Sequence, residues 1–373
     1  MIDSFVVSEF INGYRRSTNR KYIITNRREI GRFGGKGDAP VSGLENGIRP
    51  PVLRPHVPLP AFLGEMPQPL THELKDDKEG EEEEKKEEVK EEEKEEKEDI
   101  FDEEGKDNFG KWIFEAYKAA KDVGRVSIMT WRNNLNKIAS TPYSTDEEWI
   151  INVEVCDDGL VRLGIYETAA HRDWEEHAPE FVRKCMYWGR TFEGIMADPD
   201  QPGCRTKYCT VLRLDLAGIP AVVGAEMDCC DEKTGEYAEL KTHSMSTDIP
   251  LQKLRKIWIQ SYIAGVRHVY VGHRDKHGMV RAIRDLEVSW IPDIVRMRTA
   301  RPAIPSDRSE VWDPAICMGF MYHCLSWILR RVSEHKQETR HFHIHYTPAD
   351  TRVTISKGLF SYNKKVAEGD DPK

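Results

Sequence analysis

The fold of this chain is decided by the stretch Gly224-Ala225-Glu226-Met227-Asp228, followed after ten intervening residues by Glu239-Leu240-Lys241-Thr242. Both stretches read as β-strands, in which successive side chains alternate between the two faces. Glu226 and Asp228 therefore share one face of their strand, as do Glu239 and Lys241. The connecting residues include Gly235, which suits a turn, so we expect the two strands to form a hairpin.

Pairing about that turn places Asp228 opposite Glu239 and Glu226 opposite Lys241. Cβ atoms of directly opposed residues lie roughly 5 Å apart. Like charges at that distance are destabilising unless something neutralises them, and a divalent cation does so well. Carboxylates gathered beside one lysine on a β-face therefore predict metal-dependent phosphoryl chemistry.

The bulk charge of −9 is misleading because one acidic block accounts for it. Residues 73–104 hold 20 acidic residues and 7 lysines, which leaves the rest of the chain at +4. A nearly neutral body is compatible with binding a polyanion. The block is almost free of apolar residues, so we expect a disordered insert or a solvated helix, with an interaction tail as the sharper alternative.

The eight cysteines show no C-x-x-C pair and no metal-ligand spacing. We therefore expect reduced thiols in an intracellular protein. The N-terminus shows no signal-peptide pattern, and no apolar run approaches the roughly 20 residues that a membrane span needs. These features predict a soluble protein that does not enter a membrane.

The sequence divides into three parts. Residues 1–33 contain two strand-like stretches, residues 34–105 join a Pro-rich linker to the acidic insert, and globular sequence covers 106–365. Hydrophobic periodicity within the globular part predicts an α+β domain with mixed β-sheets flanked by helices. The expected long helices are 180–197, 251–266 and 314–331.

Three further features strengthen the interpretation of the hairpin. The helix 180–197 places Gly189 one turn before Glu193, so that another backbone or a substrate approaches closely beside that carboxylate. We expect a helix to begin at Arg132, whose planar guanidinium can donate paired hydrogen bonds to a phosphate. Gln260 lies on the helix after the hairpin, with Lys253 on the same flank.

In this order the motifs resemble those of the DXO family of RNA decapping exonucleases, which includes fungal relatives that partner a nuclear 5′–3′ exoribonuclease. The family motifs are an arginine, G-Φ-x-Φ-E, E-x-D and E-Φ-x-K, where Φ is apolar. The matching stretches are Ile128–Arg132, Tyr187–Glu193, Gly224–Cys229, Ala238–Thr242, Leu254–Ser261 and Trp312–Met318. The second of them departs from the motif, because Arg190 stands where the family usually has an apolar residue. The resemblance implies a single α+β domain related to the D-(D/E)xK nuclease-like core, with disordered N-terminal insertions.

The resemblance also implies a role for each matching residue. The metal would be held by Glu193, Asp228, Glu239 and the carbonyl of Leu240, with Glu226 completing a second metal or water position. The catalytic set would be Glu226, Asp228, Glu239 and Lys241. The substrate contacts would be Trp131, Arg132, Asn133, Cys209, Glu226, Lys241, Gln260 and Glu104.

The implied chemistry agrees with the residue types. Mg²⁺ and Mn²⁺ prefer carboxylate and carbonyl oxygens, and a set without His or Cys argues against zinc. Two such cations activate a water and stabilise the leaving oxygen of a phosphodiester. The resemblance implies removal of incomplete or NAD caps, release of 5′ pyrophosphate and 5′–3′ digestion of single-stranded RNA, in the quality control of mRNA 5′ ends. The same analogy implies an exoribonuclease partner and a nuclear location, with the cytoplasm as the alternative.

Two other functions compete with this interpretation. The chain would instead be a catalytically weak protein that stabilises a 5′–3′ exoribonuclease, or a DNA exonuclease of the same nuclease superfamily. Separately, His341, His343 and His345 share one strand face and suggest a metal cluster. We favour an ordinary polar strand face there, because no further ligand lies at a suitable spacing.

Overall fold

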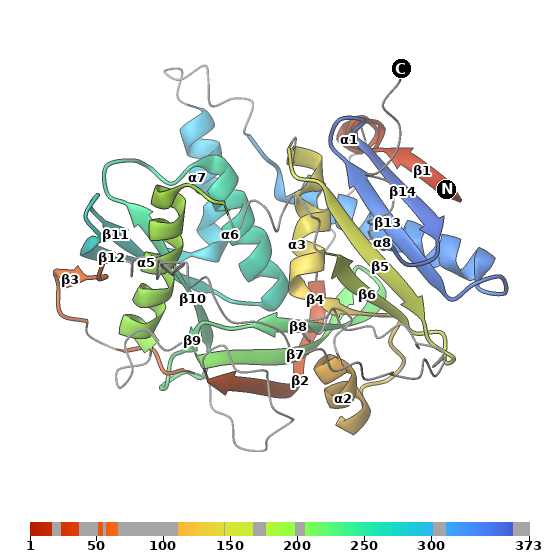
Figure 1. Cartoon of the computed structure of the whole chain (residues 1–373), viewed down its shortest axis with the longest axis horizontal. Helices are drawn as coiled ribbons and strands as arrows, with labels where there is room; N and C mark the ends of the chain where they lie inside the picture. Colours follow the sequence, from red (N-terminus) through yellow and green to blue (C-terminus); the bar gives the residue numbers. More distant parts are fainter. Residues whose placement is uncertain are drawn as a thin grey trace, which may run out of the picture.

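Two β-sheets flanked by helices make up the described part of the chain (Figure 1). The structure is a computed structural model, and it describes residues 1–16, 24–36, 51–54, 57–65, 111–144, 146–166, 177–197, 206–300 and 311–360. None of the described helices is long and apolar enough to span a membrane. The expected α+β architecture with mixed sheets is confirmed.

Within the described residues the larger sheet has nine strands and the smaller has five. In spatial order the larger contains β1 (Asp3–Val6), β14 (Arg352–Lys357), β13 (His341–Thr347), β5 (Trp149–Val155), β6 (Val161–Tyr166), β4 (Ile128–Trp131), β8 (Ile219–Glu226), β7 (Thr206–Leu216) and β2 (Ile24–Lys36). The smaller contains β3 (Ala61–Phe62), β12 (Met279–Glu287), β11 (His268–Arg274), β10 (Tyr237–Ser244) and β9 (Cys229–Cys230).

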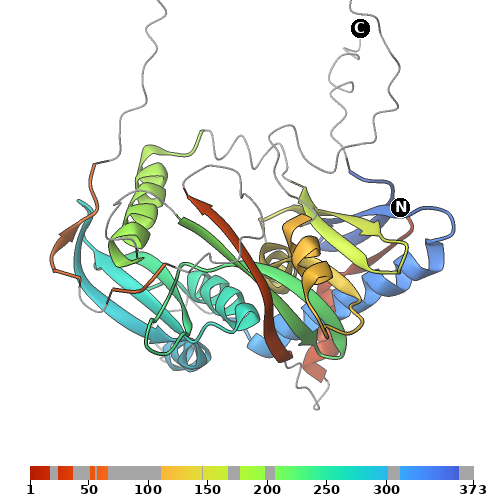
Figure 2. The same cartoon turned by 90° about the horizontal axis from the view of Figure 1, so that it is seen from below.

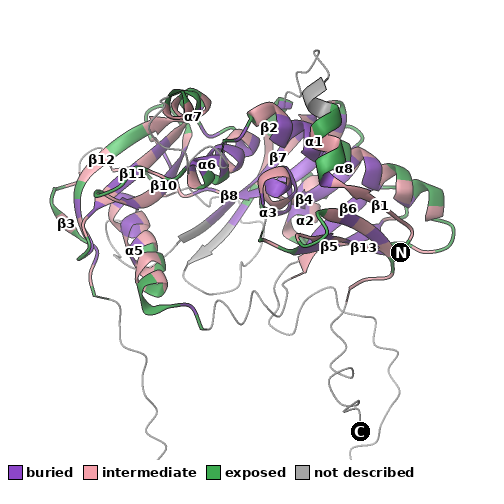
Figure 3. Ribbon diagram, turned by 90° about the horizontal axis from the view of Figure 1, so that it is seen from above, coloured by how far each residue is buried: buried purple, intermediate pink, exposed green. Residues whose placement is uncertain are grey.

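The helices predicted at 180–197, 251–266 and 314–331 lie close to those ranges. The described helices are α1 (Val7–Arg16), α2 (Lys111–Ala119), α3 (Arg132–Ser140), α5 (Glu180–Ala197), α6 (Leu251–Ala264), α7 (Ile291–Thr299) and α8 (Pro314–His335), with short 3-10 helices η1 (Thr141–Tyr143) and η2 (Val288–Trp290). Of these, α1 and α7 were not predicted. The apolar stripe of α5 buries Trp188 and Phe192, but Phe181 at its first turn is 62% exposed. Figure 3 shows that burial is concentrated in β8 and in much of α8, whereas β3 and β12 carry exposed residues.

The two ends of the described chain meet at the edge of the larger sheet. β1 pairs antiparallel with β14, with Ser4 opposite Thr354. The Asp3 carboxylate accepts hydrogen bonds from Trp327 and Arg331 of α8. These contacts between distant segments fix the first residues of the chain against its last strands.

The predicted hairpin exists, but it is shorter than expected. β9 and β10 pair antiparallel through Cys230 with Tyr237 and Cys229 with Ala238. Gly235 in the connecting turn has a φ of +71°, a conformation that glycine adopts without strain. The expected pairing of Glu226 with Lys241 is wrong, because Glu226 ends β8 in the larger sheet while Lys241 lies in the smaller one.

A short chain of polar contacts joins the two sheets next to this hairpin. The hydroxyls of Tyr208 on β7 and Tyr237 on β10 lie 3.1 Å apart, and Tyr237 donates to Glu29 on β2 at 2.8 Å. Strand β2, expected as two separate short strands, is one strand that runs along β7 across the molecule (Figure 2). Strands from both sheets therefore meet where the acidic motifs lie.

One expectation about the Pro-rich segment is corrected by the structure. Residues 34–70 were expected to form a linker without a core element, yet residues 61–62 form β3 and pair with β12. Leu63 is fully buried in a cluster with Trp188 and Phe192 of α5. Proline content predicted an extended backbone, but it did not exclude the side chains between the prolines from the core. The acidic insert lies outside the described residues.

We predict that Leu63→Ala lowers the free energy of unfolding by about 2–4 kcal/mol, because it removes a fully buried side chain. Phe62→Ala is the matched control, since Phe62 is 49% exposed on the same strand and its loss should change stability by less than about 0.5 kcal/mol. Urea unfolding followed by tryptophan fluorescence measures both. Equal effects in the two variants would contradict the anchoring role of Leu63.

Candidate active site

Two carboxylates converge where the smaller sheet meets the end of β8. Asp228 lies between β8 and β9, and its Oδ2 accepts a hydrogen bond of 2.8 Å from the backbone N–H of Leu240. Glu239 directly precedes Leu240 on β10, and it is only 1% exposed. The hairpin geometry thus brings the predicted pair together, as the register of β9 and β10 requires.

Lys241 bridges these two carboxylates. Its Nζ lies 2.5 Å from Glu239 Oε1 and 3.6 Å from Asp228 Oδ2, and it donates to the carbonyl of Leu240 at 3.1 Å. Burial alone would lower the pKa of Lys241, but the Glu239 and Asp228 carboxylates outweigh it and raise the pKa. Lys241 therefore stays charged and offsets the negative charge of the pair.

The Glu239 carboxylate also contacts side chains from two helices. Gln260 on α6 donates a hydrogen bond to its Oε1, and the Arg132 guanidinium at the start of α3 lies 3.6 Å from its Oε2. Burial, together with the nearby Asp228 charge, raises the pKa of Glu239, whereas Lys241 and Arg132 act in the opposite direction. Glu239 Oε2 itself accepts no hydrogen bond from a described residue.

Arg132 is positioned by buried polar contacts that the sequence did not reveal. It directly follows β4, and the side chain of Asn134 donates to Thr130 Oγ1 at 2.9 Å and to the carbonyl of Leu163 at 3.0 Å. Both Thr130 and Asn134 are fully buried. These hydrogen bonds fix the strand-to-helix junction, and they aim the Arg132 side chain at Glu239.

Glu193 reaches the same region from α5. The ring of Phe192 packs so closely on β11 that a Cβ at Gly272 would lie 2.6 Å from it. This close approach holds α5 against the sheet, and the Glu193 charge contributes to the raised pKa of Lys241. A Cβ at Gly189, one turn earlier, would meet no atom within 4 Å, so protein packing does not require a glycine there.

The expected substrate contacts fall into different surroundings. Trp131 is half-buried, with its ring 5.7 Å from that of Phe33, while Asn133 is exposed. Cys209 is buried on β7, directly opposite Glu226 of β8. The structure thus places Cys209 beside one of the predicted acidic residues.

Glu104 lies outside the described residues. On α6, Lys253 donates to the carbonyl of Thr242 whereas Lys256 pairs with Glu147, so these two lysines do not form one basic flank.

The donor set suits an oxygen-seeking divalent cation. Asp228, Glu239 and the Leu240 carbonyl supply only oxygen, and Glu239 Oε2, which accepts no hydrogen bond from a described residue, leaves lone pairs available. Among the described residues, no three His, Cys, Asp or Glu side chains are already gathered at metal-binding distances. In this arrangement the Lys241 ammonium provides the counter-charge between the carboxylates.

The three histidines of β13 form a polar strand face, as we favoured. His343 Nδ1 lies 2.9 Å from the carbonyl of Gly358, and His345 pairs with Glu148. The rings of His343 and His345 also contact Phe360. These contacts account for both side chains without a metal.

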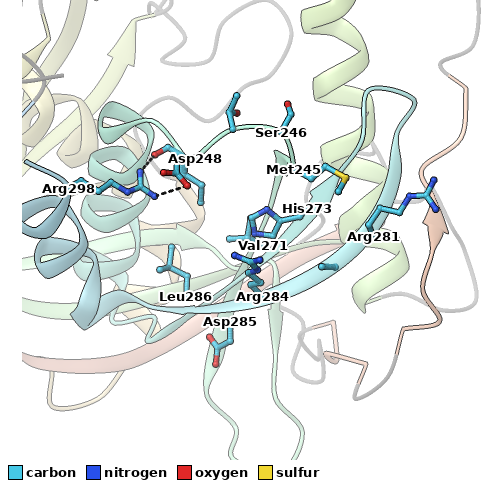
Figure 4. Close-up of a pocket in the computed structure, with 13 residues that line it drawn as sticks. Met245, Ser246, Asp248, Val271, His273, Arg281, Arg284, Asp285, Leu286 and Arg298 are labelled. Atoms are coloured by element: carbon cyan, nitrogen blue, oxygen red, sulfur yellow. Dashed lines mark hydrogen bonds and ion pairs between the residues drawn. The ribbon is translucent and has the colours of Figure 1, made fainter. Parts of the chain in front are cut away.

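A cavity of about 690 Å³ lies beyond the carboxylates, against β11, β12 and the chain before α6. Figure 4 shows His273 and Arg284 near its centre, and Arg298 of α7 directed at Asp248. Lys241, Val271 and Arg284 occupy paired positions on three neighbouring strands, so the cavity adjoins the site along the sheet. The sequence contained no signal for it, because its residues follow no motif.

Comparison with known proteins gives a consistent result. A model described as "RAI1 like PD-(D/E)XK nuclease" matches residues 81–365. The mouse "Decapping and exoribonuclease protein" is 31% identical over 250 residues, which cover 61% of this chain and 59% of that protein. The Aspergillus fumigatus "Decapping nuclease RAI1" is 26% identical over 249 residues, which cover 57% of this chain and 66% of that protein. The chain thus spans about three fifths of the length of the mouse relative.

Solved structures share the fold across most of the chain. Rai1 of S. pombe superimposes with a TM-score of 0.65 at 19% identity, covering 95% of this chain and 99% of that one. Dxo1 of K. lactis in complex with manganese gives a TM-score of 0.60 at 14% identity, covering 94% of each chain. At these identities the likeness establishes the architecture.

We predict opposite effects on stability for the two glycines beside Glu193. Gly189→Ala should raise the free energy of unfolding by about 0.5–1 kcal/mol, because alanine favours the helix and meets no neighbour. Gly272→Ala should lower it by about 1–3 kcal/mol, because its Cβ would overlap Phe192. Denaturant unfolding of both variants tests this, and destabilisation by Gly189→Ala would show that packing needs that glycine.

Proposed function

Because the chain belongs to the RAI1-like PD-(D/E)XK nuclease family, we propose that it is a divalent-metal-dependent hydrolase acting on RNA 5′ ends. The observation that carries this proposal is the buried cluster of Asp228, Glu239 and Lys241, completed by Gln260 and Arg132. Its members come from three separate elements, which makes a chance surface ion pair a poor explanation.

The residues that would hold the metal are Glu193, Asp228, Glu239 and the carbonyl oxygen of Leu240, with Glu226 at a second position. Mg²⁺ or Mn²⁺ bound there supplies Lewis-acid stabilisation of phosphate oxygens and lowers the pKa of a coordinated water. This oxygen-only set, with the open lone pairs of Glu239 Oε2, supports such a cation over zinc.

The side chains of the chain itself contribute binding and orientation. The Lys241 ammonium, next to the Leu240 carbonyl, is placed to stabilise negative charge that develops on the reacting phosphate. Gln260 holds Glu239 in one orientation and offers its amide to a water or phosphate oxygen. Arg132 offsets the charge of Glu239 from the other side, so it acts here as a positioning residue.

The names of the relatives indicate the substrate class. The mouse relative is a decapping and exoribonuclease protein, and Rai1 of Candida albicans has been solved in complex with pU5-Mn²⁺. We infer the same class for this chain: RNA 5′ ends with incomplete or NAD caps, 5′ triphosphates or 5′ monophosphates. An exoribonuclease partner and a nuclear location belong to this proposal and rest on the family resemblance.

We predict that the purified protein with Mn²⁺ hydrolyses at least one RNA from a panel of capped, triphosphorylated, NAD-capped and monophosphorylated strands. The Glu226→Ala, Asp228→Ala double variant should lose at least 100-fold in rate, since both carboxylates belong to the site. Glu236→Ala is the matched control, because Glu236 is exposed in the same hairpin and pairs only with Arg267 among the described residues. Time courses resolved on gels measure all three proteins.

Each outcome of the panel has a distinct meaning. No turnover of any RNA, or equal turnover by the double variant, would overturn the catalytic proposal. Preferential cleavage of single-stranded DNA would favour a DNA exonuclease. Absence of turnover together with a stably co-purifying exoribonuclease would favour the role of a binding partner.

We also expect Mn²⁺ to stabilise the folded protein. A ligand that binds only the native state at 100 times its Kd adds about 2.7 kcal/mol to the free energy of unfolding. The melting temperature should therefore rise with Mn²⁺ and return to its starting value in EDTA, and Asp228→Asn, Glu239→Gln should abolish the rise. Differential scanning calorimetry measures the shift, and an equal rise in the double variant would place the metal elsewhere.

A further inference from the structure

Arg274 is a buried arginine that has no carboxylate partner among the described residues. Arg274 ends β11 and is 6% exposed, with its guanidinium 4.4 Å from the centre of the Trp188 ring. Its Nη2 donates to the sulfur of Cys185 at 2.9 Å, and its Nε has no hydrogen-bond partner. In the part of the chain that the structure describes, no Asp or Glu lies within ion-pair distance of it. A buried charge with so little compensation is costly unless a ligand completes it.

A second cation is held next to this arginine. Lys253, in the first turn of α6, donates to the carbonyl of Thr242 at 2.8 Å. Burial lowers the pKa of Lys253, and the positive charges of Lys241 and Arg274 lower it further. The pKa of His243 is lowered in the same way, by burial and then by Lys253. Of these basic groups, Lys241 alone has a carboxylate partner among the described residues.

This basic region lies further along the same strands than the catalytic cluster. Arg274 is paired in register with Ser244, three residues after Lys241 on β10, and hence lies about 10 Å along the strand. Because side chains alternate, Arg274 lies on the opposite face of the sheet from Lys241, against Trp188 of α5. β9 pairs with β10 only at Tyr237 and Ala238, so in the described residues no strand covers that edge of β10 further on. On α5, a Cβ at Gly189, next to Trp188, would meet no described atom within 4 Å.

The neighbouring arginines differ from Arg274, because two of them are ion-paired and Arg284 is exposed. In the cavity of Figure 4, Arg298 lies 3.7 Å from Asp248 and donates to the carbonyl of Ile249, and Arg281 lies 3.2 Å from Asp275. Their charges are offset by protein groups. By contrast, Arg274 and Lys253 are at least partly buried cations without a carboxylate partner among the described residues, and an anionic ligand would offset their charge.

We propose that Arg274 and Lys253 form a phosphate-binding subsite for the RNA strand, and that it holds a phosphodiester further along the strand than the one at Asp228, Glu239 and Lys241. The inference rests on the proposed function and extends it. The planar guanidinium suits two phosphate oxygens, and the lysine adds a mobile point charge. Such contacts position the strand without reading its sequence. The Trp188 ring packs against the guanidinium and restricts where it can move.

The test compares charge removal on the protein with charge removal on single phosphates. A 5′-phosphorylated pentauridylate is made with a neutral methylphosphonate at each linkage in turn, and its affinity is measured by fluorescence anisotropy with Ca²⁺ as the only divalent cation. Wild-type protein should lose about tenfold in affinity when the linkage at the subsite is neutral. Arg274→Gln should bind the natural strand about tenfold more weakly and show no further loss at that one linkage, because the two changes remove the same contact.

Salt dependence and a matched control sharpen the result. The slope of log affinity against log salt should fall by roughly 0.7 for each lost cation, as expected for single strands. Arg281→Gln removes the same charge from an exposed, ion-paired arginine close by, and it should keep both the slope and the sensitivity to that linkage. Lys253→Gln supplies a second variant in case Arg274→Gln does not fold.

The outcomes separate this inference from the function on which it rests. Loss of sensitivity to one linkage in Arg274→Gln or Lys253→Gln supports the subsite. Binding of RNA by wild-type protein with unchanged sensitivity in both variants overturns the subsite alone. Failure of wild-type protein to bind or hydrolyse any RNA overturns the subsite and the proposed function together.

Discussion

The charge of Glu239 is the constraint on which the rest of the site depends. Its carboxylate is almost fully buried, and burying an ion without partners costs several kcal/mol. The compensation comes from Lys241 on the same strand, Gln260 on α6 and Arg132 at the start of α3. No single element supplies enough hydrogen bonds and positive charge to offset this cost. The two sheets and the two helices must therefore be packed together before the buried Glu239 carboxylate can be stable.

The same constraint orders the charges of the site. Negative groups gather at the junction of β8, β9 and β10, and positive groups continue along β10 and β11 through Lys253 and Arg274. Acidic groups suit a divalent cation, and the following basic groups suit the phosphates of a strand that passes it. The alternation makes the junction a suitable place to hold a polyanion while one of its phosphates reacts.

Local sequence patterns anticipated most of the helices and strands because their physical basis is local. The helix 180–197 agrees with the expected bounds, since periodicity and chain-breaking residues act over a few positions. The Pro-rich segment was misjudged because composition describes the backbone conformation, whereas the burial of Leu63 depends on packing against α5. Phe181 shows the converse: its spacing fits the apolar stripe of α5, but it remains exposed.

The sequence by itself determined that Asp228 and Glu239 oppose each other, because strand alternation and a short turn leave few registers. It also indicated a nuclease-like motif order, which the family match confirms. Only the tertiary structure decided that Glu226 lies in one sheet and Lys241 in the other, and that Arg132 meets Glu239 from more than 100 residues away. It alone brought Arg274 onto Trp188 without a carboxylate. The physical reason is that side-chain alternation is fixed within a strand, whereas the partners of a buried charge are chosen by packing between elements distant in sequence.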